Sequence, residues 1–253
     1  MEHHSILYGP VNRLLLAMFG PPPVSKFSAG WARFLFPDGE HAWIPDAAIM
    51  VLLLTAIVAI LFPLAARRFD AHRPGGVQNF LEMVVGGIRG LLEDVIGHGA
   101  GKKYLPVIGT FALFIFLGNL FGLFFPLQPP TGSLSTTVAL AVISFLYFNW
   151  QGIRENGFLG FLKHFMGPVW WLAPLFFVIE IIGNFARILS LSLRLFMNIS
   201  GEHTVTGFFA SLVPIVVPWP LMALGLFTAL LQSFIFVTLM AVYVNLSTAH
   251  EEP

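Results

Sequence analysis

Long runs of apolar residues alternate with short polar segments along this chain. A helical run of about 20 residues is long enough to cross roughly 30 Å of hydrocarbon. These runs far exceed the roughly 9–11 residues of a membrane barrel strand, so we expect helices. The sequence predicts an all-α integral membrane protein with about five transmembrane helices, over residues 47–66, 104–126, 133–150, 169–212 and 219–247.

Residues 77–96 follow a different pattern, in which apolar side chains recur at spacings of three and four. Polar residues such as Gln78, Glu82 and Glu93 fall on the other side of that helix. This amphipathic pattern is typical of a helix that lies in the membrane interface. Residues 1–46 mix aromatic residues with proline, and we expect them outside the bilayer. Because no internal repeat is evident, residues 47–253 are predicted to form a single membrane domain.

Composition supports the membrane assignment. Hydrophobic residues make up 57% of the 253 residues and charged residues only 10%, whereas a soluble domain carries about 25% charged residues. The net charge is zero, so we do not expect nucleic acid as a partner. Cysteine is absent, which excludes disulfides and thiolate metal sites.

The basic residues predict the orientation in the membrane. If the spans alternate in direction, eight basic residues of the loops lie on one side and three on the other. The side with the excess is expected to be cytoplasmic. The N-terminus and residues 1–46 then lie outside the cytoplasm, and the C-terminus lies inside. The eight residues are Arg67, Arg68, Arg73, Arg89, Lys102, Lys103, Arg154 and Lys163.

Arg194 is a charged residue within a long apolar run. A guanidinium stays protonated in proteins, and at a bilayer centre it costs about 3 kcal/mol on insertion scales. A chain that keeps a cation at this depth usually needs it to move ions or to bind an anion. Other polar residues recur at steps of three and four and share one stripe of the same helix, namely Glu180, Asn184, Arg187, Ser190, Asn198 and Glu202.

The helix that carries this stripe is too long for a simple crossing. Over residues 169–212 it is about twice as long as the hydrocarbon is thick, so it must tilt steeply or break at Gly201 or Gly207. We expect the last two helices to form a long tilted hairpin. In that hairpin, the amide carbonyl of Gln232 is a natural partner for Arg194. We interpret Arg187 as a snorkelling side chain.

Several motifs match a known family. They are SLSLRLF at residues 190–196 followed by Asn198, NLFGL at 119–123, PTGSLSTT at 130–137, LKHF at 162–165, and QSFIF at 232–236 followed by Tyr243. With these motifs in this order, the chain resembles subunit a of F-type ATP synthases over roughly residues 40–253. The combination of the arginine motif with the glutamine motif is specific to that family.

The resemblance implies a stator subunit of the F0 sector in a bacterial inner membrane. Such a subunit forms two proton half-channels against a rotating ring of c subunits, and it carries no nucleotide site. Arg194 would attract the deprotonated ring carboxylate and block a direct leak, with Gln232 holding it. Glu202 and Asn198 would belong to the outer half-channel and Glu180 to the cytoplasmic one. Ser190, Asn184 and Tyr243 complete the implied translocation face.

The resemblance also implies the partners. They are the c ring, the b subunits of the peripheral stalk, which the interfacial helix would touch, membrane lipid and the transported protons. Neither a cofactor nor a metal ion is expected.

The chain departs from the family pattern at the outer half-channel. Some members carry a histidine seven residues before the glutamine, where this chain has Gly225. The spacing between Asn198 and Glu202 is also one residue shorter than in many relatives. His203, beside Glu202, is a candidate to replace the missing histidine, because an imidazole relays protons near neutral pH.

Two other functions compete with proton conduction. The same machine could run on sodium, since the groups that select the ion would lie on the ring. A membrane scaffold that only packs partner helices is the second alternative. Asn184 and Asn198 would then be interhelical hydrogen-bond residues, and Tyr243 an aromatic-belt residue. An enzyme is disfavoured, because no nucleophile–base or metal-ligand spacing is present.

Overall fold

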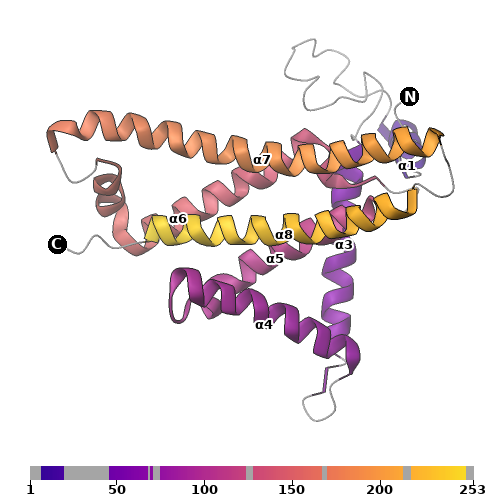
Figure 1. Ribbon diagram of the computed structural model, residues 1–253, viewed down its shortest axis with the longest axis horizontal. Helices are drawn as coiled ribbons and strands as arrows, with labels where there is room; N and C mark the ends of the chain where they lie inside the picture. Colours follow the sequence, from indigo (N-terminus) through magenta and orange to yellow (C-terminus); the bar gives the residue numbers. More distant parts are fainter. Residues whose placement is uncertain are drawn as a thin grey trace. The chain divides into compact units, whose positions relative to one another are not determined.

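The computed structural model describes residues 7–19, 46–67, 69–70, 75–123, 128–166, 170–212 and 218–248. All the regular elements in this part of the chain are helices, which confirms the predicted all-α class (Figure 1). The α-helices are α1 Tyr8–Phe19, α3 Asp46–Ala66, α4 Gly76–Ile96, α5 Ala100–Phe121, α6 Leu134–Met166, α7 Ala173–Leu212 and α8 Pro218–Thr248. Two short 3-10 turns accompany them, η2 Pro130–Gly132 and η3 Trp170–Leu172.

Five of the described helices are long and apolar enough to cross a membrane, namely α3, α5, α6, α7 and α8. Each of these helices begins within about four residues of a predicted span. The agreement follows because a membrane-crossing helix needs a long apolar run, and the sequence prediction rests on the same property. Residues 1–6 and 20–45 of the predicted outer segment lie outside the described residues, as do the C-terminal residues 249–253.

The predicted interfacial helix forms as α4. Several of its apolar side chains are exposed, with Val77 at 72%, Met83 at 67% and Phe80 at 57%, whereas Leu92 is buried. Such a face needs lipid or another chain to cover it. Its location at the membrane surface stays a prediction.

The chain divides into two compact units. One contains residues 1–68, 114–137 and 195–230, and the other contains residues 69–113, 138–194 and 231–253. Helices α5, α6, α7 and α8 each contribute a part to both units.

In the first unit, α3, the end of α5 and the turn η2 pack closely. A Cβ placed on Gly118 would lie 3.3 Å from Pro130 and 3.4 Å from Leu54, so only a small residue allows this approach. The buried Thr131 hydroxyl donates a hydrogen bond to Asn119 Oδ1 over 2.6 Å. Leu54 and Thr131 have no exposed surface, and they mark the core of this unit.

In the second unit, α8 lies against α5 and α6. Ser233 Oγ donates to the backbone carbonyl of Ala112 over 2.8 Å, and the rings of Phe111 and Phe236 stack 5.6 Å apart. A Cβ on Gly152 would lie 2.8 Å from the carbonyl oxygen of Ser247, so α6 and α8 approach closely there.

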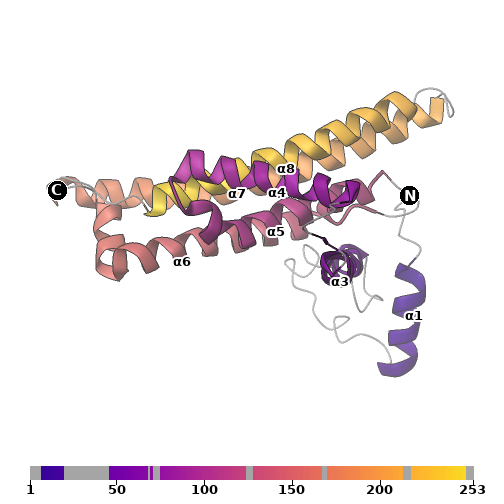
Figure 2. The same ribbon diagram turned by 90° about the horizontal axis from the view of Figure 1, so that it is seen from below.

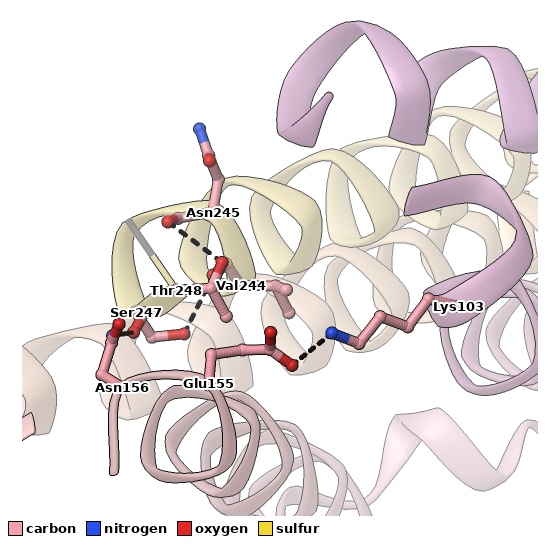
Figure 3. A network of polar contacts seen from close by, with 7 residues as sticks. All are labelled: Lys103, Glu155, Asn156, Val244, Asn245, Ser247 and Thr248. Carbon is pink, nitrogen blue, oxygen red and sulfur yellow. Dashed lines mark hydrogen bonds and ion pairs between the residues drawn. The ribbon is translucent and has the colours of Figure 1, made fainter. Parts of the chain in front are cut away.

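Helix α6 extends beyond the predicted span of residues 133–150, into the segment with Arg154 and Lys163 that the sequence predicts to be a loop. The chain stays helical to Met166 and kinks at Gly157, where φ is +70° (Figure 2). Two polar side chains of this segment find partners within the protein, which reduces the need for a solvated loop. Lys103 pairs with Glu155, and Asn156 Nδ2 donates to the carbonyl of Ser247 over 3.0 Å (Figure 3).

Helix α7 is the longest helix and runs without a break through both Gly201 and Gly207. Its 40 residues span about 60 Å, roughly twice the hydrocarbon thickness. Of the two alternatives, a break at either glycine is thus not observed, and a steep tilt in the membrane stays a prediction.

Candidate functional site

Arg194 is exposed on the surface of α7. Leu191, Leu195 and Ile199 point to the protein interior, at 4%, 0% and 2% exposure. The exposed residues around the guanidinium are both apolar and polar. Met197 is 59% exposed and Leu189 48%, and Ser190 and Asn198, one turn away on either side, are also exposed. Among the described residues, Arg194 makes no hydrogen bond or ion pair. A permanent cation thus lies on the surface of a largely apolar helix, without a hydrogen-bond or ion-pair partner among the described residues.

The predicted hydrogen bond between Gln232 and Arg194 is therefore absent from the described residues. Gln232 is only 2% exposed, and it has a partner elsewhere in the chain. Sequence alone could not decide this, because the contact depends on the rotation of α8 about its own axis. Asn198 is exposed on α7 and also has a partner in the chain.

Glu202 extends from α7 onto the backbone of α8 within the first unit. A Cβ placed on Gly225 would lie 1.8 Å from Glu202 Oε1 and 2.7 Å from its carboxyl carbon. The carboxylate thus occupies the volume that any larger residue at position 225 would fill. The carboxylate of Glu202 therefore packs directly against the backbone of Gly225.

His203 faces a different neighbour. A Cβ on Gly122 would lie 2.6 Å from His203 Nε2, so the imidazole rests against the C-terminal end of α5. Successive helix residues point about 100° apart, which explains why Glu202 and His203 diverge. No hydrogen bond or ion pair joins these two side chains among the described residues.

A third group of site residues lies on the N-terminal half of α7, in the second unit. Arg187 Nη1 donates to Asn184 Oδ1 over 2.9 Å and lies 3.5 Å from Glu180 Oε1 in an ion pair. The guanidinium carbon stands 5.3 Å from the centre of the Tyr243 ring on α8. Three predicted site residues thus meet around one arginine.

Ser190, the remaining predicted residue, is exposed on α7. Its hydroxyl donates to the carbonyl of Arg187 over 3.1 Å, a local bond within the helix.

The family assignment follows from comparison with known proteins. The family model described as ATP synthase A chain matches residues 48–245 of this chain. This chain belongs to that family. It is 45% identical over 207 residues to the ATP synthase subunit a of Geobacter sulfurreducens, covering 81% of this chain and 89% of the relative.

Two further relatives agree with this assignment. An ATP synthase subunit a 2 from Syntrophotalea carbinolica is 50% identical over 171 residues, with 68% of this chain and 72% of the relative covered. The ATP synthase subunit a of Helicobacter hepaticus is 40% identical over 205 residues, with 79% and 90% covered.

Sequence reasoning missed Arg187. Snorkelling was a fair interpretation of a lone arginine in an apolar helix, but it does not describe a side chain with partners on two helices. One signal pointed to it. Glu180 and Arg187 are seven residues apart and share a helix face, with Asn184 between them.

Proposed function

We propose that this chain is the proton-conducting stator subunit of an F-type ATP synthase, in a bacterial inner membrane. It assembles with the other F0 subunits, among them a ring of c subunits and the b subunits of the peripheral stalk. It couples proton flow to rotation of the ring and carries no catalytic site of its own. Its N-terminus lies outside the cytoplasm and its C-terminus inside.

The observation that carries the proposal is the exposed guanidinium of Arg194 on α7, a helix that is long and apolar enough to cross a membrane. A cation left bare in lipid is unfavourable, so a partner chain that brings an anion is needed. At 4 Å and an effective dielectric constant near 20, a carboxylate gains about 4 kcal/mol from such a cation. Moving one charge across 100 mV yields about 2.3 kcal/mol. The attraction is thus comparable to the free energy released when one or two protons cross the membrane. Proton flow can therefore drive both the binding and the release of a ring carboxylate.

The acidic residues on either side of Arg194 along α7 complete the path. Glu202, with Asn198, serves the half-channel open to the outside, and Glu180 serves the cytoplasmic one. A proton enters from one side, neutralises a ring carboxylate, travels with the ring and leaves on the other side. Arg194 keeps the two half-channels from joining.

The test is the variant Arg194→Ala in the whole ATP synthase, reconstituted in vesicles with an imposed proton gradient. We expect ATP synthesis to stop while assembly of the complex persists. The matched control is Arg154→Ala, which removes an exposed arginine on α6 and should leave synthesis unchanged. Synthesis at the wild-type rate by Arg194→Ala would rule out the assigned role.

A further inference from the structure

We propose that Arg187 is a positioning residue, which fixes the carboxylate of Glu180 on α7 and holds it in register with α8 through the ring of Tyr243. This inference rests on the proposed function, in which Glu180 belongs to the cytoplasmic half-channel. It adds a second arginine to the ion path, with a task different from that of Arg194.

Helix geometry explains how Arg187 reaches so far. Glu180 lies seven residues earlier, about 10.5 Å back along the axis and about 20° around it. Side chains on an α-helix lean toward the N-terminus. The long Arg187 side chain therefore runs back over two turns and passes Asn184 before it meets the carboxylate. The same nitrogen, Nη1, serves both contacts.

The surroundings of Arg187 distinguish it from a snorkelling residue. A snorkelling side chain carries its charge to water or to head groups. Here the side chain is 27% exposed and that of Glu180 is 33% exposed, and the Asn184 that accepts the bond is only 7% exposed. Arg187 is thus directed along the helix face toward partners of its own chain, of which Asn184 is buried.

Tyr243 extends the arrangement to two other helices. Its ring faces the guanidinium and also packs on Phe148 of α6, with ring centres 5.5 Å apart. A cation over an aromatic ring is attracted to it, and more strongly when water is excluded. The guanidinium is therefore held from α8 while it holds Glu180 on α7. Without Arg187, the carboxylate keeps its own rotamers and loses its fixed position.

The experiment measures ATP-driven proton pumping into vesicles that contain the whole ATP synthase, with the amount of assembled complex determined in parallel. Arg187→Leu should lower pumping per complex at least about tenfold, since a shift of 1 Å in a reacting group costs up to about a hundredfold in rate. Arg187→Lys keeps a cation on this face but has a shorter reach, so it should recover only part of the loss. The control Arg154→Leu should pump as the wild type does.

A double variant separates positioning from a general structural role. If Arg187 acts through Glu180, then Arg187→Leu should have no further effect on pumping in a Glu180→Gln background. An equal fold loss in both backgrounds overturns the proposal, as does wild-type pumping by Arg187→Leu. If Arg187→Leu fails to assemble, Tyr243→Leu is measured in the same two backgrounds, with the same expected result and the same refuting ones.

The proposed function and this inference fail in different ways. Wild-type ATP synthesis by Arg194→Ala defeats the function itself. If Arg194→Ala makes no ATP while Arg187→Leu pumps as the wild type does, only the role of Arg187 is refuted.

Discussion

Gly225→Ala is a single-methyl change aimed at the carboxylate of Glu202. The new Cβ would lie 1.8 Å from Oε1, whereas ordinary contacts begin near 3.4 Å. The oxygen must therefore retreat by about 1.6 Å. Because the obstructing atom is the far end of a flexible side chain, it can move at a cost of roughly 0.5–1.5 kcal/mol or less. The fold should survive while the carboxylate leaves its place.

The expected effect is on function rather than on assembly. A displacement of this size lowers the rate of proton transfer by up to about a hundredfold. ATP-driven acidification of vesicles, divided by the amount of assembled complex, measures it. The matched control is Gly207→Ala on α7, where an added Cβ meets nothing within 4 Å. That control should pump normally.

A compensating change at Glu202 tests whether the added methyl group acts through the carboxylate. Glu202→Asp shortens the side chain by one carbon–carbon bond, about 1.5 Å, which is close to the retreat that alanine forces. The double variant Gly225→Ala/Glu202→Asp should therefore pump faster than Gly225→Ala alone, although Glu202→Asp by itself pumps more slowly than the wild type. Normal pumping by Gly225→Ala would refute the idea that this glycine seats the carboxylate.

Two further substitutions test close approaches. Gly122→Ala should lower pumping with intact assembly, because its Cβ would lie 2.6 Å from the imidazole that rests there; the same acidification assay applies, and an unchanged rate contradicts it. Gly152→Ala should instead destabilise the subunit by about 1–3 kcal/mol, since its Cβ would lie 2.8 Å from the Phe161 ring and 2.8 Å from the backbone oxygen of Ser247, which cannot easily move away. Thermal unfolding in detergent measures this loss against Gly160→Ala, whose Cβ would make an ordinary contact at 3.5 Å.

The membrane helices could be predicted because lipid imposes a simple rule. Any segment that crosses must be apolar over about 20 residues and must satisfy its own backbone. The run at residues 47–66 shows this, since α3 covers Asp46–Ala66. This rule depends only on local composition, so it can be applied without knowing which other helices pack against the segment.

The segment after residue 150 was missed because its structure depends on distant partners. Glu155 pairs with Lys103, which lies 52 residues earlier, and Asn156 bonds to Ser247, which lies 91 residues later. Read alone, the polar composition predicts a loop. Once these partners are supplied, the same residues continue a helix, and only Gly157 with its positive φ marks the bend.

The site shows the same limit. The stripe along α7 could be read from spacing, since residues three and four apart share a face. Its contacts with α8 could not, because they depend on how two helices are rotated against each other. Gly225 is the clearest case. In the sequence it marks a missing histidine, whereas in the structure it makes room for the carboxylate of Glu202.

The two arginines of α7 differ in their surroundings, and this difference gives each a different proposed role. Arg187 and Arg194 are seven residues apart, so they share one helix face at about 10.5 Å along the axis. Arg187 has its counter-ion, its amide partner and its aromatic ring within the chain, so little attraction is left for a visiting anion. Arg194 has no such partner among the described residues. Under the proposed function, an anion on another chain would therefore be drawn to Arg194 rather than to Arg187, because Glu180 already pairs with Arg187.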